Sequence, residues 1–111
     1  MELLLAKGAA VDQADSNGAT PLFMAAQKGK KKCVELLLAK GAAVDQAQNA
    51  GQTPLLLAAY DGHEKCVQRL LEAGAEVDKA TPFGTPLSIA AQQGHETCAA
   101  LLRAAGAKDV R

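Results

Sequence analysis

The sequence predicts an all-α fold in which one helical unit is repeated along the chain. The tripeptide Thr-Pro-Leu recurs at spacings of 33 and then 32 residues, starting at Thr20, Thr53 and Thr85. Residues 1–14 and 34–47 are also copies of each other that differ only at their first position. A period of this length is typical of a solenoid, in which each unit buries its apolar side against the next one.

The repeat divides the chain into a half unit and three full units. We expect a single domain over the whole chain, with unit boundaries at 1–14, 15–47, 48–80 and 81–111. The last repeat interval is one residue short. The stretch from Val77 to Thr85 is one residue shorter than the stretch from Val44 to Thr53. The deletion is therefore predicted in the turn that precedes the last unit's first helix.

Each full unit is predicted to begin with a polar turn and a short helix. In residues 15–47, Thr20 is a favourable N-cap because its hydroxyl can accept a backbone N–H, and Pro21 suits the first helical position. An apolar face at helical spacing follows, formed by Leu22, Ala25 and Ala26. The pair Lys28-Gly29 then ends this helix.

A second helix is predicted to start near Lys31. Its apolar residues also fall at helical spacing, at Cys33, Val34, Leu37 and Leu38. Gly41 is predicted to end it, since glycine adopts the left-handed conformation that commonly follows a helix. An extended polar turn from Asp45 through Asn49 and Gly51 leads to the next Thr-Pro.

These motifs carry a resemblance to a known family. They stand in one order and recur through the chain: Gly18-Ala-Thr-Pro-Leu, Ala25-Ala26, Val34 to Leu38, Gly41-Ala-Ala-Val-Asp45, Gly62-His63 and Gly94-His95. On this basis the chain resembles an ankyrin-repeat protein over nearly its whole length. The resemblance implies an ankyrin-repeat solenoid of stacked helix-turn-helix units with projecting β-turn loops. It also implies a concave face that binds partner proteins.

The chain departs from the family pattern at two kinds of position. The histidine that usually follows Thr-Pro-Leu is replaced in all three units, by Phe23, Leu56 and Ser88. The hydrogen bonds that this histidine makes between neighbouring turns must therefore be absent or replaced, and we expect looser turns. Lys30 stands where later units have His63 and His95. A positive charge near a helix N-terminus is unfavourable, so that unit is predicted to be slightly weaker.

Composition and charge exclude several classes of partner. The 111 residues hold 12 Lys and Arg against 12 Asp and Glu, so the formal net charge is zero. A nucleic-acid partner is not expected, because such affinity comes largely from clustered cations. No apolar run approaches the roughly 20 residues that span a bilayer, and no secretion leader is recognisable. We expect an intracellular protein, cytoplasmic or nuclear and not secreted, with no membrane contact.

The two ends of the chain differ in the polarity of their stacking positions. In the last unit, Arg103 takes the place of Leu38 and Leu71, and Asp109 takes the place of Val44 and Val77. This end is predicted to terminate the stack.

The other end starts within a unit, at residues 3–5, three leucines of a second helix. Its uncapped apolar face predicts self-association. A natural fragment, an excised array and a designed array all fit this pattern.

Three cysteines occupy equivalent positions in the full units, at Cys33, Cys66 and Cys98. Equivalence indicates packing, and free buried thiols are expected. The alternative is that His63 and Cys66, or His95 and Cys98, ligate zinc or activate a thiolate, because a spacing of three places both on one helical face. Lys30 breaks that pattern and no third ligand stands at fixed spacing. We expect no metal site, no cofactor and no enzyme activity.

A dense basic run at Lys28, Lys30, Lys31 and Lys32 has two interpretations. It is either a solvated surface or a contact for an acidic partner or for phosphates. The glycine and lysine spacing of a phosphate-binding loop is missing, so a nucleotide site is not expected.

The predicted function is that of a protein-protein interaction module that binds its partner through the turn tips and first helices. The resemblance implies contact residues at Asn17, Ala19, Gln27, Lys28, Asn49, Gln52, Tyr60, Asp61, Phe83, Gln92 and Gln93. Among them Tyr60 is the favoured anchor, since exposed aromatic residues often anchor interfaces. Phe83 either joins it or folds over the shortened turn. The alternative function is a structural or designed scaffold with no specific partner, which the small residues Ser16, Ala19 and Ala50 favour.

Overall fold

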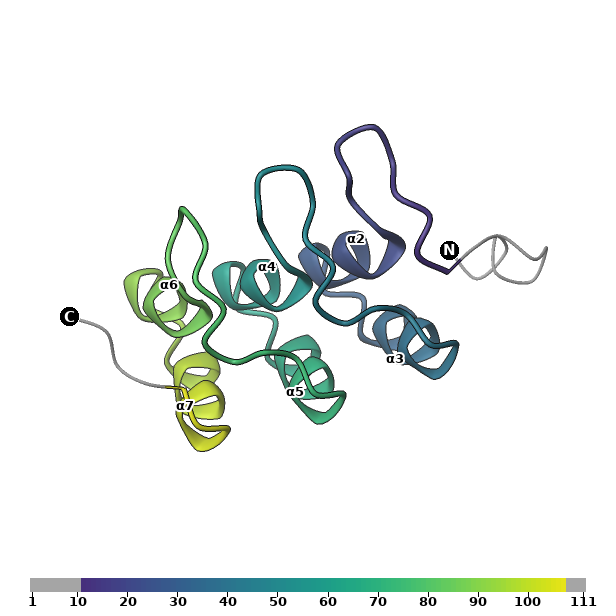
Figure 1. Ribbon diagram of the computed structural model, residues 1–111. Helices are drawn as coiled ribbons and strands as arrows, with labels where there is room; N and C mark the ends of the chain where they lie inside the picture. Colours follow the sequence, from purple (N-terminus) through teal and green to yellow (C-terminus); the bar gives the residue numbers. More distant parts are fainter. Residues whose placement is uncertain (1–10, 108–111) are drawn as a thin grey trace.

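The computed structural model describes residues 11–107, and these form an elongated stack of helices arranged in two layers. The helices α2, α4 and α6 form one layer and α3, α5 and α7 form the other (Figure 1). Extended turns project from the layer of α2, α4 and α6. Within the described residues there are six helices and no strand, apart from an isolated bridge between Thr81 and Gly84. The predicted all-α solenoid is confirmed.

The first helix of each unit begins at the Thr-Pro pair, as predicted. These helices are α2 (Pro21–Gln27), α4 (Pro54–Tyr60) and α6 (Pro86–Gln92). The hydroxyl of the preceding threonine accepts the backbone N–H three residues on, at 3.2 Å for both Thr20 and Thr53. Both hydroxyls are buried, so this hydrogen bond satisfies a polar group that water cannot reach.

The second helices are α3 (Lys31–Ala39), α5 (Glu64–Glu72) and α7 (Glu96–Ala104). Their N-cap residues are Lys30, His63 and His95, none of which caps its own helix through its side chain. A glycine with positive φ follows each helix, for example Gly41 at +89°. The amide of the residue after this glycine then donates to a carbonyl in the last turn of the helix, as in Ala42 N–H to the Leu37 carbonyl at 3.0 Å, and this bond closes the helix end.

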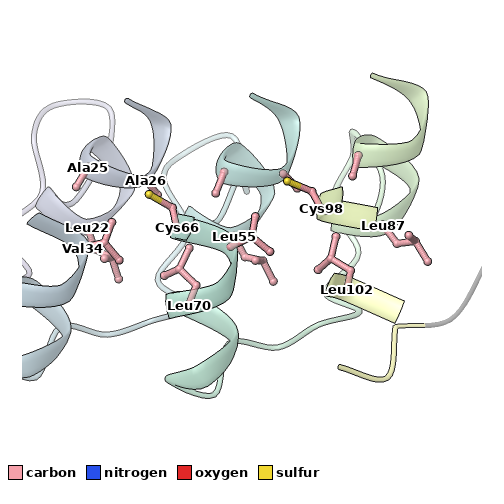
Figure 2. Packing of buried hydrophobic residues seen from close by; sticks show 14 of the residues in the cluster. Leu22, Ala25, Ala26, Val34, Leu55, Cys66, Leu70, Leu87, Cys98 and Leu102 are labelled. Atoms are coloured by element: carbon pink, nitrogen blue, oxygen red, sulfur yellow. The ribbon is translucent and has the colours of Figure 1, made fainter. Parts of the chain in front are cut away.

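The core is a continuous seam between the two layers. Figure 2 shows its buried side chains lying in a row from one unit to the next. Leucines and alanines dominate it, with Leu22, Leu55 and Leu87 in the first helices and Leu37, Leu70 and Leu102 in the second. The thiols of Cys66 and Cys98 are buried in this seam, and Cys33 is half-buried against it. All three cysteines are free.

Each histidine N-cap joins its own unit to the preceding one. The Nε2–H of His63 donates to the backbone carbonyl of Gln27 at 3.0 Å, and that of His95 donates to the carbonyl of Tyr60 at 2.9 Å. These carbonyls lie in the last residue of α2 and α4, where no intrahelical donor remains. The histidines therefore hold adjacent first helices in register.

The fit between histidine and glycine is close in both of these joints. A Cβ atom on Gly29 would lie 2.6 Å from the ring of His63, and one on Gly62 would lie 2.6 Å from the ring of His95. Only glycine leaves room for the ring and also adopts the positive φ that these residues have. The motif Gly-His thus pairs each glycine with the histidine of the following unit.

The far ends of the second helices are joined by aspartates. The Oδ1 atom of Asp12 accepts the backbone N–H of Ala43 at 2.9 Å, and the carboxylate of Asp45 accepts the N–H of Glu76 at 3.1 Å. Arg69 of α5 adds an ion pair to Glu35 of α3 at 2.6 Å. The units of α3 and α5 are therefore connected at both ends of their helices.

At the C-terminal end of the stack, Arg103 is exposed, whereas Leu38 and Leu71 pack half-buried against the core. That this end terminates the stack stays a prediction. Asp109 and the leucines at positions 3–5, on which the self-association expectation rests, lie outside the described residues.

Candidate functional site

The projecting turns form one edge of the candidate site. The first two span Asp15–Ala19 and Gln48–Gln52, each closed by a hydrogen bond from the first N–H to the last carbonyl, at 3.0 and 2.9 Å. The third spans Thr81–Gly84 and is closed in the same way at 3.1 Å. It is one residue shorter, which confirms the predicted position of the deletion.

The first two turns are hydrogen-bonded to each other. The backbone N–H of Asn49 donates to the carbonyl of Asn17 at 2.9 Å, and the Asn49 side-chain amide donates to the carbonyl of Ser16 at 3.4 Å. Gly18 lies against this asparagine, since a Cβ there would be 2.5 Å from its side-chain oxygen. Within residues 11–107, no hydrogen bond joins the second turn to the third.

The positions that lack the family histidine are filled in two ways. Phe23 and Leu56 are buried in a second apolar cluster with Ala19, Leu57 and Ile89. Ser88 instead forms a capping box, accepting the N–H of Thr85 at 3.0 Å, while the Thr85 hydroxyl accepts the N–H of Ser88 at 3.2 Å. The expected loss of the histidine bonds is thus compensated by apolar packing and by a local cap.

A hollow of about 220 Å³ opens between α4, α6 and the second and third turns. Its lining residues are Gln52, Leu56, Leu57, Tyr60, Phe83, Ile89, Gln92 and Gln93. The leucines and the isoleucine are almost fully buried and form its floor. No charged side chain lines it, so it is an apolar recess with amide groups at its rim.

The two aromatic residues at its rim are the large hydrophobic side chains that the described chain leaves exposed. Tyr60 is 47% exposed and Phe83 is 51% exposed. Phe83 stands next to Gly84 at the tip of the shortened turn, and half of its surface is open. The alternative in which Phe83 covers the core is therefore not observed.

The structure separates the sequence-predicted contact residues into three groups. Around the hollow it brings together Gln52, Tyr60, Phe83, Gln92 and Gln93. Further along the same side it leaves exposed Asn17, Gln27, Lys28, Asn49 and Asp61. Ala19 requires a correction, because it is only 7% exposed and packs beside Phe23, so it offers no contact surface. It directly precedes the buried cap Thr20, which draws it into the apolar cluster.

Sequence reasoning missed the floor of the hollow. Leu56, Leu57 and Ile89 were not among the predicted contacts, and their positions in the first helices are compatible with an ordinary core. The one signal in the sequence is the consecutive run Leu55-Leu56-Leu57. Three successive apolar residues cannot all face one side of a helix, so at least one of them must face away from the second-helix layer.

Charge varies along the row of first-helix ends. Lys28, Asp61 and Gln93 are the C-cap residues of α2, α4 and α6, and all three are exposed. The row therefore runs from positive at α2 to negative at α4 and neutral at α6. In the described residues neither Lys28 nor the neighbouring Lys30 takes part in an ion pair.

Two further hollows, of about 340 and 310 Å³, lie at the N-termini of α5 and α7. They are lined by His63 with Cys66 and by His95 with Cys98. Burial raises the pKa of both thiols, and the carboxylates of Glu35 and Glu64 raise it further. A thiolate is disfavoured here, and each histidine Nε2 is engaged by a carbonyl. The described residues include no group of three or more metal-ligating side chains.

Stacked helix pairs with projecting turns define a helical repeat protein, a class built for contact along one face. A family model, ankyrin repeats in three copies, matches residues 1–81 and 45–111. The chain belongs to the ankyrin-repeat family, whose members are generally protein-interaction modules and typically not catalysts. No curated protein matches the chain. Among the described residues, no helix has the length and apolar character to cross a membrane.

Proposed function

We propose that the chain is a protein-protein interaction module whose partner binds along the turn tips and first helices, centred on the hollow between α4 and α6. The observation that carries the proposal is the pair of exposed aromatic residues, Tyr60 and Phe83, on either side of an apolar recess. Exposed aromatic side chains beside a pocket are the usual composition of an interface hot spot. We propose no catalytic role, and the raised pKa of the Cys66 and Cys98 thiols supports this.

The surrounding surface supports the same assignment. Gln52, Gln92 and Gln93 place uncharged donors and acceptors around the recess, which is the polar rim that an interface core requires. Asn17, Gln27, Lys28, Asn49 and Asp61 extend the proposed contact surface along the stack. With the proposed unit boundaries at 15, 48 and 81, each full unit has one turn and one first helix. Three free cysteines support a reducing compartment, cytoplasmic or nuclear.

The proposal is tested by affinity capture from a cell lysate with the chain and with a Tyr60→Gln/Phe83→Ala variant. Glutamine is what the chain itself carries at Gln27 and Gln92, the positions equivalent to Tyr60. The substitution is therefore compatible with the helix. Retained proteins are identified by mass spectrometry, and each variant is first checked for an unchanged thermal unfolding midpoint.

The expected result is a protein that the parent chain retains and the double variant loses. A matched control, Lys40→Gln, changes an exposed residue at the end of α3, remote from the hollow, and is expected to retain the same protein. Retention of nothing specific by the parent chain would favour the alternative, a structural or designed scaffold without a specific partner. The exposed small residues Ser16 and Ala50 are the feature that favours this alternative.

A further inference from the structure

We propose that the hollow between α4 and α6 receives a linear segment of the partner, which inserts one bulky apolar side chain between Tyr60 and Phe83 and carries acidic residues toward Lys28. This inference rests on the proposed function and specifies the chemistry of the partner. Its two parts, an apolar anchor and an acidic flank, depend on different residues and can be tested separately.

The size of the hollow favours a single side chain. Its volume of about 220 Å³ is below the roughly 300–1,000 Å³ typical of sites for small molecules and cofactors. It is lined by almost fully buried side chains from two successive first helices, Leu56 and Leu57 of α4 and Ile89 of α6. A bulky apolar residue inserted here would leave water and contact the aromatic rings of both walls.

The rim favours the backbone of an extended segment on either side of the anchor. Gln52, Gln92 and Gln93 each carry an amide that can donate to a carbonyl and accept from an N–H. A peptide backbone presents both groups at every residue, whereas a bare apolar ligand presents neither. Asp61 follows Tyr60 directly, so an acidic residue beside the anchor would be repelled.

The acidic flank is argued from the charges at the ends of the first helices. Lys28 lies at the end of α2, it is exposed, and neither it nor Lys30 is in an ion pair within the described residues. Helices packed in one layer lie about 8–10 Å apart, so Lys28 is one to two helix spacings, roughly 8–20 Å, from the hollow. An extended chain covers that distance in about three to six residues.

The test is selection of linear peptides on the immobilised chain from a displayed random library of about 12-residue sequences, long enough to span from the hollow to Lys28. We expect the enriched sequences to share one large apolar residue with Asp or Glu about three to six residues away on one side. Synthetic versions of two enriched peptides are then titrated against the chain by fluorescence anisotropy.

The variants separate the two parts of the inference. Tyr60→Gln is expected to weaken binding about tenfold or more, because it removes the anchor's main contact. Lys28→Gln, which copies the residue that the chain has at Gln93, is expected to weaken it about two- to fivefold and to reduce its dependence on salt. Lys40→Gln, an equal charge change at the end of α3, is expected to leave affinity unchanged.

Several outcomes would overturn this inference. Enriched peptides without an acidic preference, or peptides whose affinity is the same for Tyr60→Gln, would contradict it. Enrichment of no peptide, while a lysate protein is still captured through Tyr60 and Phe83, would mean that the hollow recognises a folded surface. The proposed function would then stand without the inference. If no peptide is enriched and no lysate protein is captured through Tyr60 and Phe83, both the inference and the proposed function are rejected.

Discussion

Two interfaces between units can be compared: the first joins the units of α2 and α4, and the second joins the units of α4 and α6. They are alike in their helices and different in their turns. In both, a histidine Nε2–H donates to the end of the preceding first helix, at 3.0 and 2.9 Å, and its ring fills the space above a glycine. Only the first interface has hydrogen-bonded turn tips, through Asn49. The second has a shortened turn and a hollow bordered by Tyr60 and Phe83.

This difference teaches which part of the unit can vary. Stacking depends on the buried helix faces and on the Gly-His pairs, and both are the same at the two interfaces. The third turn differs in length and residues from the first two, yet α4 and α6 pack against each other as α2 and α4 do. Variation of this kind at a turn tip then changes the proposed binding surface while the helix packing is kept.

The largest expected effect is on the helix layers that the two interfaces share. Leu70 is fully buried in α5, which packs against both α3 and α7. Leu70→Ala should lower the free energy of unfolding by about 2–5 kcal/mol, since it leaves a cavity in the middle of the stack. Urea denaturation measures this, with Leu71→Ala, a half-buried neighbour, as the control expected to cost less. If Leu70→Ala lowers the free energy of unfolding by only about 1 kcal/mol or less, Leu70 does not lie at the centre of the core.

The next largest effect is expected at the glycines that pack against the histidine rings. Gly62→Ala should be more destabilising than Gly94→Ala, although the two glycines have φ of +73° and +75°. Both variants incur the left-handed backbone cost of about 1–2 kcal/mol. Only Gly62→Ala also pushes a methyl group into the ring of His95, which adds about 1–3 kcal/mol, because nothing lies within 4 Å of a Cβ at Gly94.

Thermal or urea unfolding of the same variants checks the comparison directly. Gly29→Ala should match Gly62→Ala, because its Cβ would meet His63 at the same distance of 2.6 Å. Equal losses for Gly62→Ala and Gly94→Ala would mean that the ring moves aside without cost. A Gly29→Ala loss close to that of Gly94→Ala would mean that the two interfaces differ in their helices as well.

The smallest effect concerns the buried thiols, one in each of α5 and α7. Burial raises the pKa of Cys66 and Cys98 above that of an unfolded cysteine, about 8.5. The unfolded chain therefore loses these protons first as the pH rises. The thiols favour the folded state fully below about pH 8.5, and this contribution declines above it toward the folded pKa.

The temperature of the unfolding midpoint should therefore decrease as the pH is raised above about 8.5. The fall should be smaller in a Cys66→Ala/Cys98→Ala variant. Cys33→Ala is the matched control for the loss of a thiol, because Cys33 is only half-buried. An identical pH dependence in all three proteins would contradict the assignment to the buried thiols.

Much of the fold could be predicted from the sequence because its determinants are local. Thr-Pro pairs start the first helices, glycines follow the second helices, and apolar spacing identifies the buried faces. The deletion before Thr85 was also predictable, since the repeat period itself reveals it. Each of these features depends on residues that are close together in the chain.

The candidate site was less predictable because it depends on contacts between units. Tyr60 was a predicted anchor, but its neighbour Phe83 had two alternatives that only the path of the shortened turn decides. Leu56 and Leu57 form the floor of the hollow, although their sequence is that of a core. Ala19 was assigned to the surface by its place in a turn, yet packing against Phe23 buries it. Spacing along one unit does not reveal how far the next unit covers it.

The one-residue shortening of the third turn implies a simple route to new recognition surfaces. Loop length, unlike a core substitution, can change beside a Gly-His joint that keeps the helices aligned, as it has in the third turn. A one-residue insertion or loss in a turn would then alter the surface beside that turn's own first helix. A tandem array of this kind can thus diversify its surface one repeat at a time while its buried seam stays unchanged.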